Sequence, residues 1–251
     1  MVSTVLTGVF LPFLGTALGS SAVFFMKSNR RAALTDCLSG FTGGIMLAAS
    51  VWSLLIPAIE KSNHLGAVAF VPASVGFMLG VVFMLLSERL IERLTASAKG
   101  IKSRFVTAFA VTIHNIPEGM AVGMVYAALL SDMTSAAVAG AVSLSLGIAI
   151  QNIPEGAIVS LPLYNGETGK LKAFLSGVLS GGVEPVAAAV AILCVGFFSP
   201  LMPYFLSFAA GAMIFVVMHE LSVEMKSESG RGILFFAFGF SLMMSLDVAL
   251  G

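Results

Sequence analysis

Long apolar segments separated by short polar breaks recur along the whole chain and predict eight membrane-spanning helices. Their approximate bounds are residues 4–26, 33–58, 66–87, 104–129, 134–162, 171–197, 202–225 and 231–250. Each segment has about the 20 residues that a helix needs to cross the hydrocarbon core of a bilayer. Barrel strands are only about ten residues long and alternate apolar with polar positions, which these segments do not. We therefore expect an all-α integral membrane protein with a single transmembrane domain, residues 1–251.

The composition strengthens this expectation. Hydrophobic residues make up 58% of the chain and charged residues 10%, and the mean hydropathy is +1.01. A soluble domain carries about 25% charged residues. The formal net charge is zero, so the composition does not indicate a nucleic-acid partner. Cys37 and Cys194 lie in apolar segments and predict free thiols rather than a disulfide.

The positions of the basic residues predict how the spans are oriented. Lys and Arg accumulate in cytoplasmic loops, and twelve of the thirteen basic residues fall on one side of the predicted bundle, with only Lys61 opposite. Both termini are then outside. The first apolar segment has its positive charge after it rather than before it, so we expect a retained span and no cleaved signal peptide. The twelve residues are Lys27, Arg30, Arg31, Arg89, Arg93, Lys99, Lys102, Arg104, Lys170, Lys172, Lys226 and Arg231.

A polar motif, Asn-Ile-Pro-Glu-Gly, occurs twice, at 115–119 and 152–156, in consecutive apolar segments. Residues three and four apart share a helix face, so the polar side chains of each copy lie together. These are His114, Asn115 and Glu118 in the first copy and Gln151, Asn152 and Glu155 in the second. Because consecutive spans are antiparallel, the fourth and fifth spans form an inverted repeat. Matching polar interruptions of this kind indicate an ion site near the middle of the membrane.

The prolines of the motif predict kinked helices. Pro117 cannot donate a hydrogen bond to the carbonyl of Ile113, and Pro154 cannot donate to that of Ile150. Freed carbonyl oxygens inside a membrane are tolerated only where protein or a water-filled cavity satisfies them. A bound cation would satisfy them as well.

A third carboxylate, Glu184, lies in the Gly-Gly-Val-Glu-Pro sequence of the sixth segment, residues 181–185. No Lys or Arg occurs in the interiors of the fourth to sixth segments, so three buried carboxylates there must be protonated or face a cation. Carboxylates and carboxamides with one imidazole suit Zn²⁺, Mn²⁺, Fe²⁺, Co²⁺ or Ni²⁺. The seven polar side chains exceed one tetrahedral shell, so we hypothesise two metals bridged by Glu118 and Glu155.

Two other functions stay open at this point. An intramembrane metallohydrolase could use a His-Glu-x-x-His motif, which His219-Glu220 begins, although Val223 replaces the second His. A proton-coupled carrier could use the carboxylates without metal.

These motifs carry a resemblance to a known family. His-Asn-Ile-Pro-Glu-Gly at 114–119, Gln-Asn-Ile-Pro-Glu-Gly at 151–156 and Gly-Gly-Val-Glu-Pro at 181–185 resemble the ZIP (Zrt-, Irt-like protein) metal transporters, especially the GufA-like prokaryotic branch. The resemblance covers the whole chain. It implies a transporter, not an enzyme, that moves Zn²⁺ toward the cytoplasm through the plasma (inner) membrane of a prokaryote. Cd²⁺, Fe²⁺, Mn²⁺, Co²⁺ and Ni²⁺ are further candidate substrates. The resemblance suggests a homodimer in the lipid bilayer and implies no cofactor.

The resemblance also implies which residues meet the metal. A two-metal site would be lined by His114, Asn115, Glu118, Gln151, Asn152, Glu155 and Glu184, with Met46 of the 44–50 stretch beside them. Metal would leave past His219, Glu220 and Glu224. Apart from the resemblance, Glu60, His64 and Asp132 are candidate entry residues on the outer side, with ordinary polar loop residues as the alternative.

Two departures from the family pattern affect the expected affinity. Many relatives have His where this chain has Gln151, and some have a carboxylate where it has Asn152. We therefore expect weaker binding and less discrimination among metals. The cytoplasmic loop 88–104 contains no His, unlike the His-rich loop of many relatives, so loop-based metal sensing is not expected.

Overall fold

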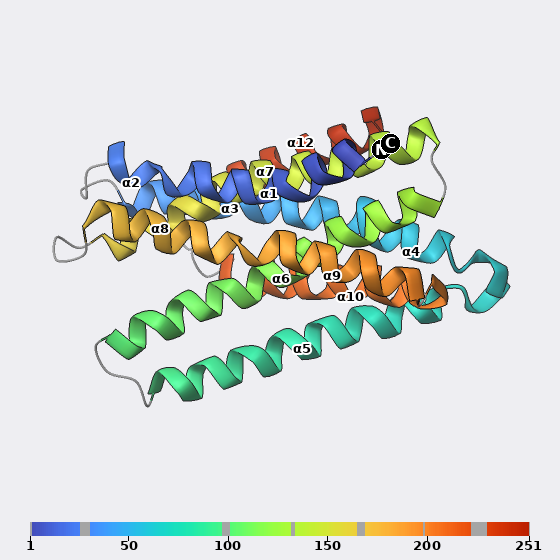
Figure 1. Ribbon diagram of the computed structural model, residues 1–251, viewed down its shortest axis with the longest axis horizontal. Coiled ribbons are helices and arrows are strands. Elements are labelled where there is room, and N and C mark those ends of the chain that lie inside the picture. Colours follow the sequence, from blue (N-terminus) through green and yellow to red (C-terminus); the bar gives the residue numbers. More distant parts are fainter. Residues whose placement is uncertain are drawn as a thin grey trace.

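The computed structural model describes residues 2–25, 31–96, 101–131, 134–164, 169–197, 199–221 and 230–250. Within these ranges all regular structure is helical and no strand occurs. The helices form an elongated bundle, and both ends of the chain lie toward the same end of it (Figure 1).

Helices occupy the described part of each apolar segment predicted from the sequence. In chain order they are α1 (Val2–Ser20), α2 (Ala22–Phe25), α3 (Arg31–Ala49), η2 (Ser50–Leu55), α4 (Ile56–Glu60), η3 (Asn63–Val68), α5 (Phe70–Ala96), α6 (Ile101–Ser131), α7 (Ser135–Leu163), α8 (Lys170–Gly181), α9 (Val183–Phe197), η4 (Ser199–Leu201), α10 (Met202–Val216), η5 (Val217–Leu221) and α12 (Arg231–Leu250).

Seven helical segments among the described residues are long and apolar enough to cross a membrane. Each corresponds to one of the predicted spans. The remaining predicted span is α6, a 31-residue helix that carries the polar first copy of the repeat and is not among the seven. The chain is thus an all-helical, multi-pass membrane protein.

The third predicted span, 66–87, has different bounds in the structure. Residues Asn63–Val68 form a short 3₁₀ helix in which Gly66 has φ 60° and ψ −125°, a backbone conformation that glycine adopts far more easily than other residues. The α-helix begins only at Phe70 and continues to Ala96. The helix extends beyond the end of the apolar segment, because the Glu, Arg and Leu residues that follow this segment all favour a helix.

Besides the third, four of the predicted spans are not continuous α-helices. The first is interrupted by a turn at Ser21, between α1 and α2. The second and seventh contain the π-helical turns η2 and η5. The sixth is divided at Gly182 into α8 and α9. Pro185 explains this division, because it cannot donate the helical hydrogen bond to the carbonyl of Gly181. By contrast, α6 and α7 continue through Pro117 and Pro154 without a break.

The helices pack most extensively as four pairs: α1 with α7, α3 with α12, α5 with α10, and α6 with α9. Glycines allow the backbones to touch in every pair. A Cβ atom at Gly156, Gly44, Gly80 or Gly119 would overlap a carbonyl oxygen of the partner helix. Small residues of this kind are the usual means of close packing between membrane helices.

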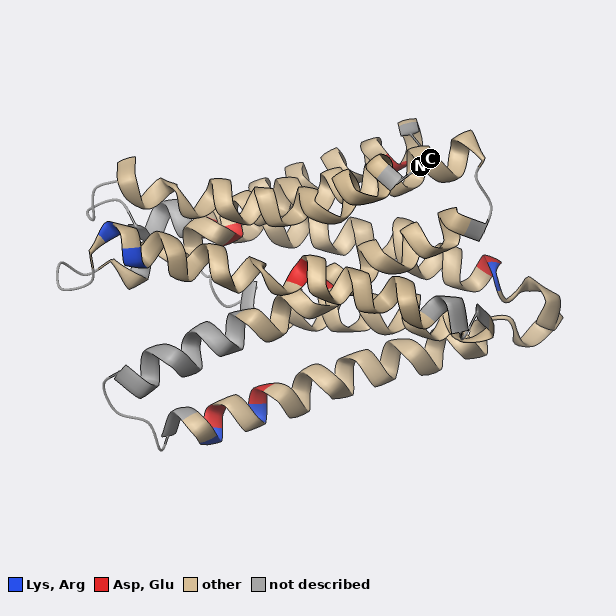
Figure 2. Cartoon of the chain, viewed as in Figure 1, with Lys and Arg blue, Asp and Glu red and all other residues tan. Residues whose placement is uncertain are grey.

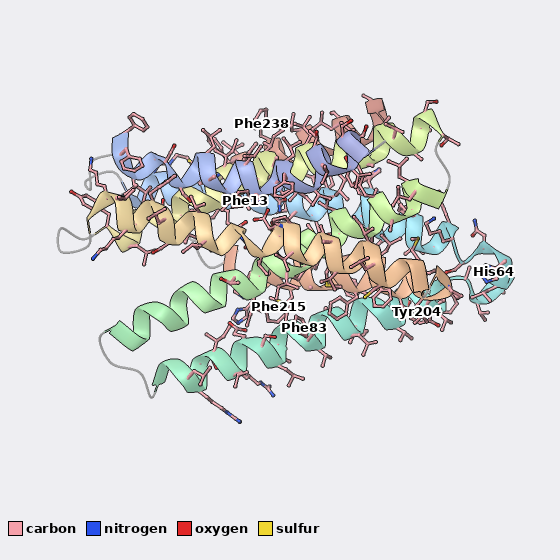
Figure 3. The ribbon with its side chains drawn as sticks, viewed as in Figure 1. Phe13, His64, Phe83, Tyr204, Phe215 and Phe238 are labelled. Atoms are coloured by element: carbon pink, nitrogen blue, oxygen red, sulfur yellow. The ribbon has the colours of Figure 1, made fainter. Side chains whose placement is uncertain are left out.

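The outer surface of the bundle suits lipid, and its ends suit water. On α12 the side chains of Ile233, Leu234 and Phe238 are more than 60% exposed, and Phe238 points away from the bundle (Figure 3). The basic residues visible in Figure 2 gather at one end, where α5 ends and α8 begins, apart from one that follows α4 at the other end. The latter is Lys61, the residue that caps α4.

Candidate metal site

Three helices bring the predicted carboxylates together inside the bundle. Glu118 lies on α6, Glu155 on α7, and Glu184 in the first turn of α9. Helix α6 closely approaches α9 at Gly119, where a Cβ atom would overlap the carbonyl oxygen of Glu184. Glycine beside Glu118 therefore places the two carboxylates within electrostatic reach of each other, and Glu155 lies within reach of both.

Glu118 is 1% exposed. Its Oε1 atom accepts a hydrogen bond from Nε2 of Gln151 at 2.7 Å. Its Oε2 atom is buried and has no hydrogen-bond partner among the described residues. One half of this carboxylate is thus satisfied across the α6–α7 contact, and the other half is left as a bare acceptor.

Glu184 is equally buried, but both of its oxygens have donors. Oε1 accepts from Oγ1 of Thr16 at 2.9 Å and from Nδ2 of Asn115 at 3.1 Å, and Oε2 accepts from Nδ2 of Asn152 at 3.0 Å. The donors come from α1, α6 and α7, so this one carboxylate ties three helices together.

Four buried oxygen atoms at the site lack a hydrogen-bond donor in the described part of the chain. They are Oε2 of Glu118, Oδ1 of Asn115, Oε1 of Gln151 and Oδ1 of Asn152. A buried acceptor without a partner costs about 1–3 kcal/mol, and a divalent cation is a partner that oxygen acceptors suit. The donor set therefore fits a metal ion as a substrate of this site.

Carboxylate and imidazole groups alone do not form such a site. Among the described residues no three His, Cys, Asp or Glu side chains are grouped so that they could hold one ion. The amide oxygens of Asn115, Gln151 and Asn152 would have to take part. Each amide can present its oxygen instead of its NH₂ group by turning about its last side-chain bond.

The other two residues predicted for the central site lie on suitable helix faces. His114 is half-buried on α6, one turn before Glu118. Met46 of α3 is 2% exposed, and it lies one turn after Thr42, whose hydroxyl donates to the carbonyl of Gln151 at 3.4 Å. This face of α3 therefore packs against the second copy of the repeat.

The predicted exit residues are described only in part. His219 in η5 is half-exposed; its Nδ1 lies 2.8 Å from Oε1 of Glu88 on α5, and its ring stacks on Phe215 with centroids 5.2 Å apart. The side chain of Glu220 and the whole of Glu224 lie outside the described residues.

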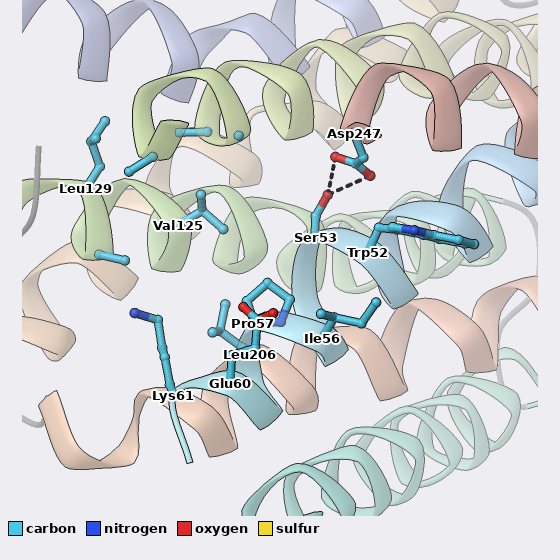
Figure 4. A pocket seen from close by; sticks show the side chains of 14 residues that line it. Trp52, Ser53, Ile56, Pro57, Glu60, Lys61, Val125, Leu129, Leu206 and Asp247 are labelled. Atoms are coloured by element: carbon cyan, nitrogen blue, oxygen red, sulfur yellow. Dashed lines mark hydrogen bonds between the residues drawn. The ribbon is translucent and has the colours of Figure 1, made fainter. Parts of the chain in front are cut away.

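A cavity of about 410 Å³ opens near the end of the bundle where Lys61 lies (Figure 4). Asp247 lines it and accepts hydrogen bonds from Ser53, at 2.9 and 3.0 Å, and from Ser143, at 3.1 Å. Of the outer residues named from the sequence, Glu60 lines this cavity and His64 does not. Asp132 lies outside the described residues.

Thr16 and Asp247 are two polar residues of these sites that the sequence analysis did not identify. For Asp247 a signal existed, because it is the only acidic residue in the apolar segment 231–250. For Thr16 there was none, since a single hydroxyl in an apolar helix is commonplace and only the packing shows what it contacts.

A family model and individual relatives both match this chain, and both are described as zinc transporters. The model of a family described as "ZIP Zinc transporter" matches residues 99–247, which include both copies of the repeat and Glu184. The zinc transporter ZIP11 of Xenopus tropicalis is 36% identical over 98% of this chain and 97% of its own length. The zinc transporter GufA of Myxococcus xanthus is 33% identical over 94% and 96%, and the zinc transporter ZIPB of Bordetella bronchiseptica is 32% identical over 95% and 79%.

Proposed function

Since the chain belongs to the ZIP family of zinc transporters, we propose that it moves Zn²⁺ and related divalent metal ions across a membrane into the cytoplasm. The observation that carries this proposal is the group of four buried oxygens without donors, beside three carboxylates, at the centre of the bundle. A proton carrier that uses no metal would not explain why amide oxygens, which do not titrate, are left without partners there.

The proposed topology is a single transmembrane domain, residues 1–251, with eight spans and both termini outside. The seven apolar segments support it, with α6 as the eighth span, because a helix of 31 residues is about 46 Å long and exceeds the ~30 Å hydrocarbon core. The gathering of basic residues at one end of the bundle supports the cytoplasmic assignment of that end. Location in the plasma membrane of a prokaryote and a homodimeric assembly follow from the family resemblance.

The proposed site holds two metal ions between α6, α7 and α9, the two kinked and inverted repeat helices and their neighbour. Glu118 and Glu155 would bridge the two ions. The remaining ligands would come from His114, Asn115, Gln151, Asn152 and Glu184, with Met46 beside them. Because ligands must be deprotonated to bind, zinc uptake should weaken at acidic pH.

The proposed route begins in the cavity that Asp247 and Glu60 line and ends past His219, Glu220 and Glu224. Alternating exposure by movement of helix groups is the general expectation for carriers built from repeats. The glycine contacts within the α1–α7 and α6–α9 pairs favour their moving as units, because such contacts cannot slide without overlap.

Zinc influx into liposomes tests the function. Purified protein is reconstituted around a membrane-impermeant zinc indicator, Zn²⁺ is added outside, and protein-free liposomes serve as the baseline. Competition by Cd²⁺, Fe²⁺ and Mn²⁺, with and without a pH gradient, reveals the substrate range and any proton coupling. Influx no faster than the baseline for every metal would refute the proposal.

Replacing Gln151 by His should tighten zinc binding about tenfold, because imidazole is a stronger zinc ligand than an amide oxygen. Mn²⁺ binding should change much less, since Mn²⁺ prefers oxygen ligands. Dissociation constants of the two metals are measured by competition with a coloured chelator, with Gln151→Asn as the matched control. Equal tightening for both metals would contradict a direct ligand role for residue 151.

Replacing Asp247 by Asn should slow zinc influx about three- to tenfold at low metal concentration and low salt, because a carboxylate in a cavity raises the local cation concentration. At saturating zinc or high salt the difference should shrink, since salt screens this attraction. Initial rates are compared over a range of zinc and salt concentrations. An equal loss under all conditions would assign Asp247 to structure rather than to capture.

A further inference from the structure

We propose that Thr16 is a positioning residue that holds one oxygen of Glu184, so that Glu184 meets the metal through its other oxygen alone. The inference rests on the proposed function, since it concerns how the same site selects its substrate. It adds α1, a helix with no predicted ligand, to the parts of the protein that determine metal preference.

Thr16 makes a short, buried hydrogen bond to Glu184. Thr16 is 1% exposed, and its Oγ1 lies 2.9 Å from Oε1 of Glu184. The alternative acceptor within its own helix, the carbonyl oxygen of Pro12, is 3.5 Å away. A hydroxyl has a single proton to donate, and the shorter, charge-assisted bond to the carboxylate is the stronger one.

Packing against two neighbouring helices fixes Thr16 in place. A Cβ atom at Gly156 of α7 would overlap the carbonyl oxygen of Thr16, and one at Gly181 of α8 would lie 2.8 Å from its Cβ and Cγ2 atoms. Two glycines on different helices therefore enclose this residue. These contacts hold the backbone and the side chain of Thr16 against α7 and α8, next to Glu184.

The three hydrogen-bond donors to Glu184 are not equivalent. Asn115 and Asn152 each carry a buried Oδ1 without a donor. An amide that turns to bring this oxygen closer to a metal would withdraw its NH₂ group from Glu184. Thr16 has no such second role, so its hydrogen bond can persist while metal is bound.

Holding one oxygen of Glu184 affects which metal ions the site prefers. With Oε1 held by Thr16, Oε2 is the oxygen that Asn152 vacates and that a metal can take. Zn²⁺ takes four ligands and accepts one carboxylate oxygen, whereas Ca²⁺ takes six to eight oxygens and often binds both oxygens of a carboxylate. Thr16 therefore favours a small ion over Ca²⁺.

The test compares Thr16→Val, which keeps the shape but removes the donor, with Thr16→Ser, which keeps the donor. Ser20→Ala is the matched control, because this hydroxyl lies one turn further along α1, is equally buried, and donates to the carbonyl of Gly156 rather than to a carboxylate. Equilibrium binding of Zn²⁺ and of Ca²⁺ to the purified full chain is measured, together with the unfolding temperature without metal.

Thr16→Val should weaken zinc binding about tenfold and reduce the preference for Zn²⁺ over Ca²⁺. Thr16→Ser and Ser20→Ala should match the parent protein in both. If Thr16→Val does not fold, Thr16→Ala, which also lacks the donor, takes its place. Its binding of Zn²⁺ and Ca²⁺ is then compared with that of Thr16→Ser. The proposal is overturned if the variant without the donor binds zinc like the parent, if Thr16→Ser loses as much as that variant, or if the preference over Ca²⁺ is unchanged. Failure of the parent protein to bind any metal would instead refute the proposed function.

Discussion

Zinc influx is expected to fall more than about a hundredfold when Glu118 is replaced by Gln, because loss of a charged ligand should exceed the 10- to 100-fold typical of groups that only support a ligand. Among the described residues of the site, Glu118 carries a carboxylate oxygen that is buried and without a donor. Glutamine keeps the size of the side chain but removes its negative charge. It also places an NH₂ group where one of the two carboxylate oxygens would face a cation.

The same substitution should leave the metal-free protein at least as stable. Glu118 lies within electrostatic reach of Glu155 and Glu184, so removing its charge relieves repulsion in a low-dielectric interior. Stability is lost at many functional sites for the sake of activity. We therefore expect an unchanged or higher unfolding temperature without metal, and loss of the stabilisation that zinc gives the parent protein.

Influx into liposomes and unfolding in detergent, with and without zinc, measure both effects. The control is Glu92→Gln, the same change at an exposed position near the end of α5. Glu118→Gln influx within a few-fold of the parent would contradict the proposed bridging role. An equal loss in Glu92→Gln would show that the substitution acts on something other than the site.

Features that depend on local sequence were predicted well. Apolar segments of about 20 residues gave the positions of the helices, because burial in lipid requires every backbone group to be bonded within its own helix. The repeat placed Glu118 and Glu155 on helices that approach each other, and Glu184 was recognised as a third carboxylate near them. Each of these features depends on only a few consecutive residues, so it can be recognised without knowledge of the tertiary packing.

Features that depend on packing between distant segments could not be predicted. Thr16 and Glu184 are 168 residues apart, and only the contacts of α1 with α7 and α8 bring them together. The π-helical turn η5 contains no proline or glycine that would indicate it. The bounds of α5 differed because apolar content locates the membrane, whereas Gly66 and the charged residues after Ser87 determine where the helix itself begins and ends.

The second large effect is expected at Gly156, where replacement by Ala should destabilise the protein by about 3 kcal/mol. The added Cβ would overlap the carbonyl oxygen of Thr16 and lie 2.9 Å from the backbone nitrogen of Ser20. Both atoms belong to the backbone of α1, so no side-chain rotation can relieve the overlap. The helix must move away from α7, and Thr16 must then move away from Glu184.

Gly140 on the same helix provides the matched control, because a Cβ there would meet nothing within 4 Å. Gly140→Ala should be neutral or stabilising by up to about 1 kcal/mol, the gain from replacing glycine inside a helix. Unfolding temperatures in detergent and zinc dissociation constants are compared for the two variants. Gly156→Ala should lower the unfolding temperature and weaken zinc binding together, whereas Gly140→Ala should do neither. Equal unfolding temperatures for the two variants would mean that the α1–α7 contact is looser than the structure shows. The positioning of Glu184 by Thr16 would then be contradicted as well.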